Sequence, residues 1–292
     1  MSKYSQRLTI HIGLPKTATT TIQRTLYKNC SILSDLGIDY CPELCKLGKH
    51  STAEGHHALP TFLCSPDSVH YKKIDESRIR SSFARPGELL ISSEGFTQAR
   101  KRHLQYMVDN WTLPEERRVV LVLRNELDRI RSQWMQAVKT GHQYLSLRDY
   151  YLQVYKPGRL TVKQRLAIWE SFGFASCVLR YEDLKTHESD ISRAFLENIY
   201  DVKISESVWK KVKDANISPS PEFVQSYQGI LNLESWRWAK CWLERRHPRF
   251  RMLAHNMLSK SEALGLSIMR QPCEADLELI QQDLALLPSF DS

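Results

Sequence analysis

Residues 8–23 read LTIHIGLPKTATTTIQ, and this stretch decides how the chain folds. The first five residues are an apolar run of the kind found in a buried strand. A Gly-Leu-Pro corner follows, then one lysine and a run of threonines that leads into a helical pattern. A strand, a tight loop and a helix start leave free backbone N–H groups at the helix N-terminus, where the helix dipole favours an anion. The stretch therefore predicts a phosphate-binding loop in an α/β fold.

The side chains of this loop suit a phosphate. Gly13 permits an unusual backbone angle, and Lys16 supplies a mobile cation. Three loop hydroxyls are potential donors to phosphate oxygens: Thr17, Thr19 and Thr20. A Walker A loop needs Gly directly before the lysine, and Pro15 stands there, which disfavours an ATP-hydrolysing P-loop enzyme. A plain strand-to-helix turn capped by a threonine is the alternative.

The rest of the chain repeats the strand-helix alternation as far as about residue 200. Further apolar runs lie at residues 88–92, 119–123 and 177–180. Helical patterns lie between and after them, at residues 20–27, 127–138, 162–172 and 191–200. This alternation predicts a parallel α/β sheet. We expect one domain over residues 1–292, with its core at about 8–200. A C-terminal helical extension is expected at about 215–292, with helices at 224–246 and 274–287.

Composition narrows the class of protein. The 292 residues carry a net charge of +8, which favours an anionic partner. The seven cysteines have no framework spacing, so free thiols in a reducing compartment are expected. Cys41 and Cys45, with the histidines that follow, match no standard zinc spacing, and we expect no metal. The sequence shows neither a signal peptide nor a membrane span, so a cytoplasmic location is expected.

Residues 14–20, LPKTATT, resemble the 5′-phosphosulfate loop of sulfotransferases that use 3′-phosphoadenosine 5′-phosphosulfate (PAPS), which runs roughly xPK[ST]GTT. Ala18 stands where the family usually has glycine, and alanine is tolerable there only at an ordinary backbone angle. The resemblance implies that these loop residues bind the donor: Gly13, Lys16, Thr17, Ala18, Thr19, Thr20 and Thr21. The cytosolic branch has tryptophan at the position of Thr21, so this chain is nearer the bacterial and glycan-type branches.

A second motif, VVLVLRNELDRIRSQW at residues 119–134, resembles the 3′-phosphate site of the same family. It implies that Arg124 and Ser132 bind the 3′-phosphate, although Glu126 replaces the usual proline. Taken alone, the motif is also typical of an amphipathic helix with exposed charges. The segment RYEDLK resembles a family segment whose tyrosine, here Tyr181, can contact the adenine. A tyrosine that caps the sheet is the alternative.

The resemblance covers about residues 8–200 and implies a P-loop-like three-layer fold, with a central parallel sheet flanked by helices. It implies a PAPS-dependent sulfotransferase that modifies an acceptor hydroxyl of a sugar or glycan without a metal. Lys16 would stabilise the leaving group. Glu94, in ELLISSEGF, resembles the catalytic glutamate of glycan-type members and would be the base. The rival base is a histidine of GHHAL, His56 or His57, of which we include His57 in the site.

Other functions remain open at the level of sequence. A sulfotransferase acting on a small molecule other than a sugar fits the same motifs. A nucleotide kinase on a degenerate P-loop, or a basic nucleic-acid-binding protein, fits fewer of them. The sequence carries no helix-turn-helix, zinc-finger or RRM signature, so we do not expect a nucleic-acid partner.

Overall fold

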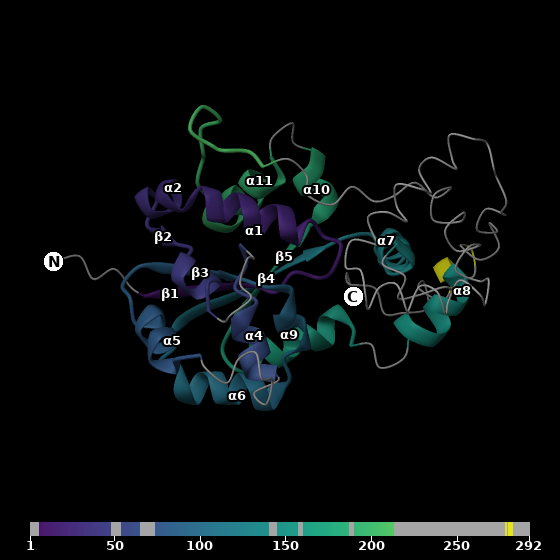
Figure 1. Ribbon diagram of the computed structural model, residues 1–292, viewed down its shortest axis with the longest axis horizontal. Helices are drawn as coiled ribbons and strands as arrows, with labels where there is room; N and C mark the ends of the chain where they lie inside the picture. Colours follow the sequence, from purple (N-terminus) through teal and green to yellow (C-terminus); the bar gives the residue numbers. More distant parts are fainter. Residues whose placement is uncertain are drawn as a thin grey trace, which may run out of the picture. The chain divides into compact units, whose positions relative to one another are not determined.

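The computed structural model describes residues 6–47, 54–64, 74–139, 145–156, 160–186, 190–212, 278 and 280–282. The chain divides into two compact units (Figure 1). The first comprises Met1–Arg124 and Leu160–Asn216, and the second comprises Asn125–Arg159 and Ile217–Ser292. The single-domain organisation stays a prediction. The helices expected at 224–246 and 274–287 lie outside the described residues, apart from 278 and 280–282, which are helical.

A five-stranded sheet forms the centre of the first unit (Figure 1). Its strands are β1 (Arg7–His11), β2 (Ile38–Asp39), β3 (Glu88–Ser92), β4 (Glu116–Leu123) and β5 (Ala175–Arg180). Their order is β2-β3-β1-β4-β5, and every pairing is parallel. The parallel α/β sheet and the four expected strands are thus confirmed. Strand β2 has two residues, too few to show a periodicity.

Helices cover both faces of this sheet, which gives the predicted three layers (Figure 1). Alternate strand residues face opposite sides, so Leu89 and Ile91 join one core while Leu90 joins the other. One face is covered by α4 (Ala58–Cys64), α5 (Glu76–Phe83), α6 (Lys101–Asn110) and α9 (Val162–Glu170). The other is covered by α1 (Thr19–Lys28), α2 (Cys30–Asp35), α10 (Tyr181–Thr186) and α11 (Ile191–Tyr200). Two short helices complete the unit, α3 (Pro42–Cys45) and the 3₁₀ helix η1 (Glu94–Gln98).

The described part of the second unit is helical. It contains α7 (Glu126–Lys139), α8 (Leu147–Tyr150) and the π-helix η2 (Tyr151–Tyr155), so the helix expected at 127–138 is confirmed. Its core consists of Ile130, Trp134, Met135, Leu147, Tyr150, Tyr151 and Ile280. The Trp134 indole donates a hydrogen bond to the Leu145 carbonyl at 2.9 Å. Among the helices described in either unit, none has the length and apolar character needed to cross a membrane.

Candidate active site

The loop between β1 and α1 lies where the sheet changes its direction of winding. From β1 the chain continues to β2 and β3 on one side, and then to β4 and β5 on the other. In open parallel sheets, ligands bind at the carboxyl ends of the strands that flank such a switch point. The register pairs His11 with Ser92 of β3 and with Val120 of β4. Residues that follow these strands therefore surround the loop.

The backbone of the loop leaves the helix N-terminus open. Helix α1 begins at Thr19, and its N-cap residue, Ala18, makes no side-chain capping bond. The first helical hydrogen bond joins the Ile22 N–H to the Ala18 carbonyl at 3.0 Å. The N–H groups of residues 19–21 precede that bond, so they have no partner within the helix. An open N-terminus of a ten-residue helix suits an anion.

Two non-glycine residues of the loop have left-handed backbones, Lys16 with φ 70° and Ala18 with φ 60°. This conformation costs an L-residue about 1–2 kcal/mol. The sequence left two cases open for Ala18, an ordinary backbone angle or a strained loop with a positive φ, and the structure has the second. Left-handed residues next to ordinary ones turn successive N–H groups toward one side and form a nest for anions. Strain of this kind is concentrated at binding sites.

Gly13 is needed for a reason that differs from the one expected. Its φ is not left-handed, so the predicted unusual backbone angle is wrong. A Cβ at this position would lie 2.6 Å from Cγ2 and 2.7 Å from Oγ1 of Thr19, and 3.2 Å from Nε2 of His11. Gly13 therefore lets the end of β1 approach the first turn of α1 closely.

The threonine hydroxyls largely serve the loop itself. Thr17 and Thr19 are buried, and both donate to the Leu14 carbonyl, at 2.7 and 3.2 Å. Thr20 is half-buried and Thr21 is buried. Since a hydroxyl has one proton to donate, the backbone N–H groups are the better placed anion donors in this conformation. The roles predicted for these four side chains in donor binding stay predictions.

Arg124 and Tyr181 lie beside the loop, as their positions after β4 and β5 require. The register pairs Leu123 with Arg180, so the residues that follow them are neighbours. The Arg124 guanidinium lies 5.1 Å from the centre of the Tyr181 ring. Its Nη1 donates to the Lys16 carbonyl at 3.1 Å. Arg124 therefore contacts both Lys16 and Tyr181, and all three residues were predicted for the site.

Ser132 and Glu126 belong to the second unit. Ser132 is buried on α7, and its convergence with Arg124 stays a prediction. Glu126, which replaces the proline of the family motif, forms a two-bond ion pair with Arg129 (2.8 and 3.0 Å) and accepts from the Tyr155 hydroxyl. The substituting carboxylate is thus neutralised within its own helix.

Glu94 is placed beside the loop by the turn that follows β3. Burial raises the pKa of its carboxyl above the ordinary value, while the Thr19 hydroxyl and the Lys16 ammonium act in the opposite direction. Because these two partners belong to the loop, Glu94 faces the predicted anion site. A carboxyl group with a raised pKa beside a cation has the properties of a general base.

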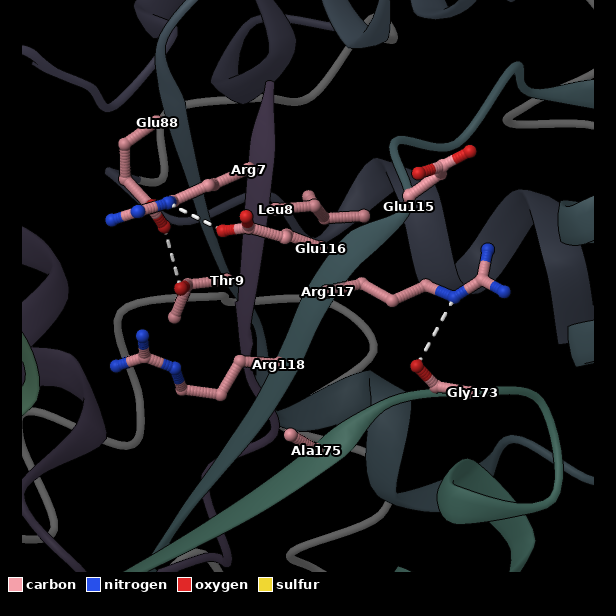
Figure 2. A pocket seen from close by; sticks show the side chains of 10 residues that line it. All are labelled: Arg7, Leu8, Thr9, Glu88, Glu115, Glu116, Arg117, Arg118, Gly173 and Ala175. Carbon is pink, nitrogen blue, oxygen red and sulfur yellow. Dashed lines mark hydrogen bonds and ion pairs between the residues drawn. The ribbon is translucent and has the colours of Figure 1, made fainter. Parts of the chain in front are cut away.

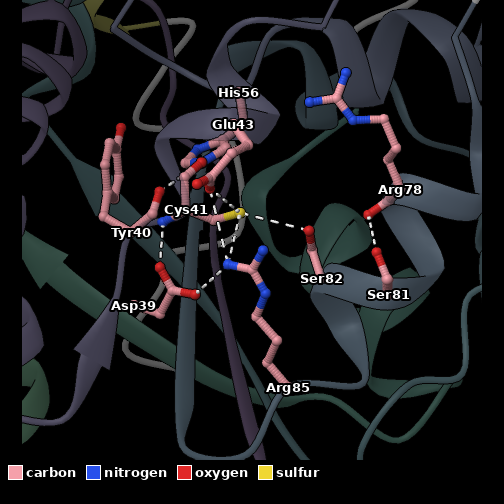
Figure 3. Close-up of polar contacts among 9 residues, drawn as sticks. All are labelled: Asp39, Tyr40, Cys41, Glu43, His56, Arg78, Ser81, Ser82 and Arg85. Carbon is pink, nitrogen blue, oxygen red and sulfur yellow. Dashed lines mark hydrogen bonds and ion pairs between the residues drawn. The ribbon is translucent and has the colours of Figure 1, made fainter.

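The two histidines of GHHAL have different surroundings. His56 is fully buried, and its ring bonds to the backbone at both nitrogens. Nε2 bonds to the Tyr40 carbonyl (Figure 3), and Nδ1 accepts from the Ser92 N–H. Burial lowers its pKa to about 4. His57 is half-buried, with Nδ1 3.0 Å from the Ser93 hydroxyl, and burial lowers its pKa too. Both ring nitrogens of His56 are used in bonds that hold the backbone. His57, in contrast, contacts Ser93, the residue immediately before Glu94.

A buried polar network beneath the loop was not predicted. His11 lies fully buried in β1, with Nδ1 2.9 Å from the Ser92 hydroxyl, to which the Gln23 amide also donates at 3.2 Å. Burial lowers the pKa of His11 to about 3. Its Nε2 has no hydrogen-bond partner among the described residues. The one signal in the sequence is a histidine that interrupts the apolar run LTIHI.

A cavity of about 330 Å³ lies at the opposite, amino edge of the sheet (Figure 2). Its lining carries three arginines and three glutamates: Arg7, Arg117, Arg118, Glu88, Glu115 and Glu116. Most of these charges have internal partners, such as the ion pair between Arg7 and Glu116 at 2.6 Å. None of the sequence-predicted site residues lines this cavity.

The described cysteines are free thiols: Cys30, Cys41, Cys45, Cys64 and Cys177. Cys41 is buried, with its sulfur 3.4 Å from Oε2 of Glu43 and 3.5 Å from the Ser82 hydroxyl, and burial raises the pKa of the thiol (Figure 3). A thiol with a raised pKa is a poor nucleophile at neutral pH. Within the described ranges, no group of three or more His, Cys, Asp and Glu side chains is placed to hold a metal ion.

No protein-family model matches the sequence, and no curated protein matches it. Among solved structures, the fold is similar to that of a sulfotransferase from Alicyclobacillus acidocaldarius. The likeness covers 78% of this chain and 98% of that one, at 16% identity and a TM-score of 0.45. A likeness at this level carries no argument about activity, so the proposal below rests on the residues of this chain.

Proposed function

We propose that the protein is a sulfotransferase that moves the sulfuryl group of PAPS to an acceptor hydroxyl and releases 3′-phosphoadenosine 5′-phosphate. One observation carries the proposal: Lys16, Arg124, Tyr181 and Glu94 lie around the open N-terminus of α1. These residues come from four separate stretches of the sequence. A plain strand-to-helix turn has no need of a guanidinium, a half-buried carboxylate and two left-handed residues at one place.

The residues of this edge suit a donor with two anionic ends. The N–H groups at the start of α1 and the Lys16 ammonium would hold the 5′-phosphosulfate. Arg124 offers a planar fork suited to the 3′-phosphate, and Ser132 is the second residue predicted to bind that phosphate. Tyr181, which the Arg124 guanidinium overlies, would border the adenine.

Glu94 and Lys16 divide the chemistry between them. Glu94 would accept the proton of the acceptor hydroxyl as the oxygen forms its bond to sulfur. The bond between sulfur and the 5′-phosphate oxygen breaks in the same step, and Lys16 would neutralise the charge that develops on that oxygen. Because the charge on the leaving oxygen grows during the reaction, Lys16 would stabilise the transition state more than the bound donor.

We propose a carbohydrate as the acceptor. The support is the resemblance of Glu94 and its flanking residues to glycan-type members, together with the net charge of +8, which suits an acidic glycan.

Calorimetric binding of 3′-phosphoadenosine 5′-phosphate, compared with ADP and AMP, tests the proposal. We expect micromolar binding that requires the 3′-phosphate and falls at least tenfold in Arg124→Ala. Arg117→Ala is the matched control, because Arg117 lies on β4, the strand that Arg124 follows. It also stacks on an aromatic ring, at 5.5 Å, and donates to a carbonyl at 3.3 Å, but at the amino edge. Equal affinity for 3′-phosphoadenosine 5′-phosphate and ADP, or equal losses in the two variants, would refute the proposal.

A further inference from the structure

The segment GHHALP, residues 55–60, is bonded to the end of β3 immediately before Glu94. The His56 N–H donates to the Ser92 carbonyl at 2.9 Å, and the Ser92 N–H donates to Nδ1 of His56 at 3.1 Å. Nε2 of His56 donates to the Tyr40 carbonyl at 2.8 Å (Figure 3). His56 thereby joins the ends of β2 and β3 and fixes the residue that follows it, His57.

The contact of His57 reaches the turn that carries Glu94. Nδ1 of His57 lies 3.0 Å from the Ser93 hydroxyl. The same hydroxyl accepts the Gly95 N–H at 3.3 Å, as the N-cap of the 3₁₀ helix that begins at Glu94. One oxygen therefore connects the imidazole to the first turn of that helix.

The two segments also pack without space between them. A Cβ at Gly95 would lie 2.7 Å from Cγ of Pro60. A Cβ at Gly55 would lie 2.7 Å from Nε2 of His57 and 2.6 Å from Oε1 of Gln23. Glycines at both positions permit this approach, and Nε2 of His57 lies close to the backbone of Gly55.

We propose that His57 is a positioning residue for Glu94, which acts through the Ser93 hydroxyl to hold the Glu94 carboxylate beside Lys16 and Thr19. Nδ1 of His57 is used by Ser93, and Glu94 remains the proposed base. We call the contact between His57 and the Ser93 hydroxyl the brace. Its catalytic importance rests on the proposed function. The brace itself is tested without donor or acceptor.

The test is the titration of the Glu94 carboxyl, followed by carbon-13 NMR in protein labelled at the glutamate side-chain carboxyl, with Glu94→Gln to assign the signal. The burial that raises the pKa of this carboxyl requires a fixed turn. In His57→Ala we expect that pKa to shift down toward its ordinary value. In His57→Asn, whose amide lies near the place of Nδ1, we expect no shift, since an amide can either donate to Ser93 or accept from it. His57→Gln, whose amide lies near the place of Nε2, should behave like His57→Ala.

The Ser93 hydroxyl provides the second arm. Ser93→Ala should shift the Glu94 titration as His57→Ala does, and the double variant should shift it no further, because both changes remove one interaction. Thermal melting of each variant confirms that the titration is read on folded protein. An unchanged titration in His57→Ala, additive shifts in the double variant, or rescue by Gln instead of Asn would each overturn the inference. Calorimetric binding of 3′-phosphoadenosine 5′-phosphate in the same samples tests the proposed function separately, so either idea can fail alone.

Discussion

Replacing Ala18 by glycine should stabilise this protein, although glycine usually destabilises an element. Ala18 has φ 60° in the structure, a left-handed conformation that costs an L-residue about 1–2 kcal/mol. Glycine adopts it without that cost, but it loses about 0.5–1 kcal/mol more backbone entropy on folding than alanine. The change removes one methyl group from a half-buried position. We therefore expect a net gain of about 0.5–1 kcal/mol in the free energy of unfolding.

Urea denaturation measures this gain. With a slope of about 2–3 kcal/mol per molar urea, the midpoint should rise by roughly 0.2–0.5 M at an unchanged slope. The control is Ala167→Gly, an exposed position inside α9, where glycine should cost about 1 kcal/mol. The two identical substitutions should thus move the midpoint in opposite directions. A loss of stability in Ala18→Gly comparable to that of the control would show that Ala18 is not left-handed in solution.

Three further predictions concern the site and its surroundings. Gly13→Ala should lower the free energy of unfolding by about 1–3 kcal/mol and weaken nucleotide binding in calorimetry, because its methyl group would lie 2.6 Å from Thr19. Glu94→Gln should stabilise the fold increasingly as pH rises above 4.5, the ordinary carboxyl value, and the gain should level off above the higher folded pKa. The reason is that a carboxyl whose pKa is raised in the folded state destabilises the fold when it ionises. Urea midpoints of the two proteins across pH 4–8 check this, and a difference that is constant with pH would contradict it. Glu126→Ala should lower the free energy of unfolding, measured by urea denaturation, by about 3–5 kcal/mol, because Arg129, which is 6% exposed, loses its carboxylate partner. Glu126→Gln should lower it less.

The fold could be predicted from periodicity, because its strands are covered on both faces. A strand buried on both sides is a continuous apolar run, and residues 119–123 are one. Strand β2 was missed because a pair of residues carries no pattern and depends on its pairing with β3. The segment 39–85 has weak periodicity for a related reason. Its helices within the described residues are short, and His56 is held by bonds to Ser92 of β3 that only the tertiary structure creates.

The site was predictable where a motif places a residue directly after a strand. Arg124 and Tyr181 could be paired with the loop because neighbouring parallel strands end at one edge. The contact between His57 and Ser93 could not be predicted, since the two residues are 36 positions apart and nothing in GHHAL or ELLISSEGF indicates that the two stretches pair. The function of Gly13 was misread for a similar reason, because a close approach between β1 and α1 is a property of packing.

The two edges of the sheet differ in how completely their charges and backbone groups are compensated. At the amino edge, Arg117 stacks on Phe174. It also donates to the Gly173 carbonyl, beside the Arg7 to Glu116 ion pair (Figure 2). At the carboxyl edge, a helix starts without a side-chain cap, two non-glycine residues are left-handed, and the half-buried Glu94 carboxyl has a raised pKa. Each of these features lowers stability and none is needed for the sheet to form. A ligand with anionic groups would compensate the open helix N-terminus at once, and this asymmetry is the physical reason to assign binding to the carboxyl edge.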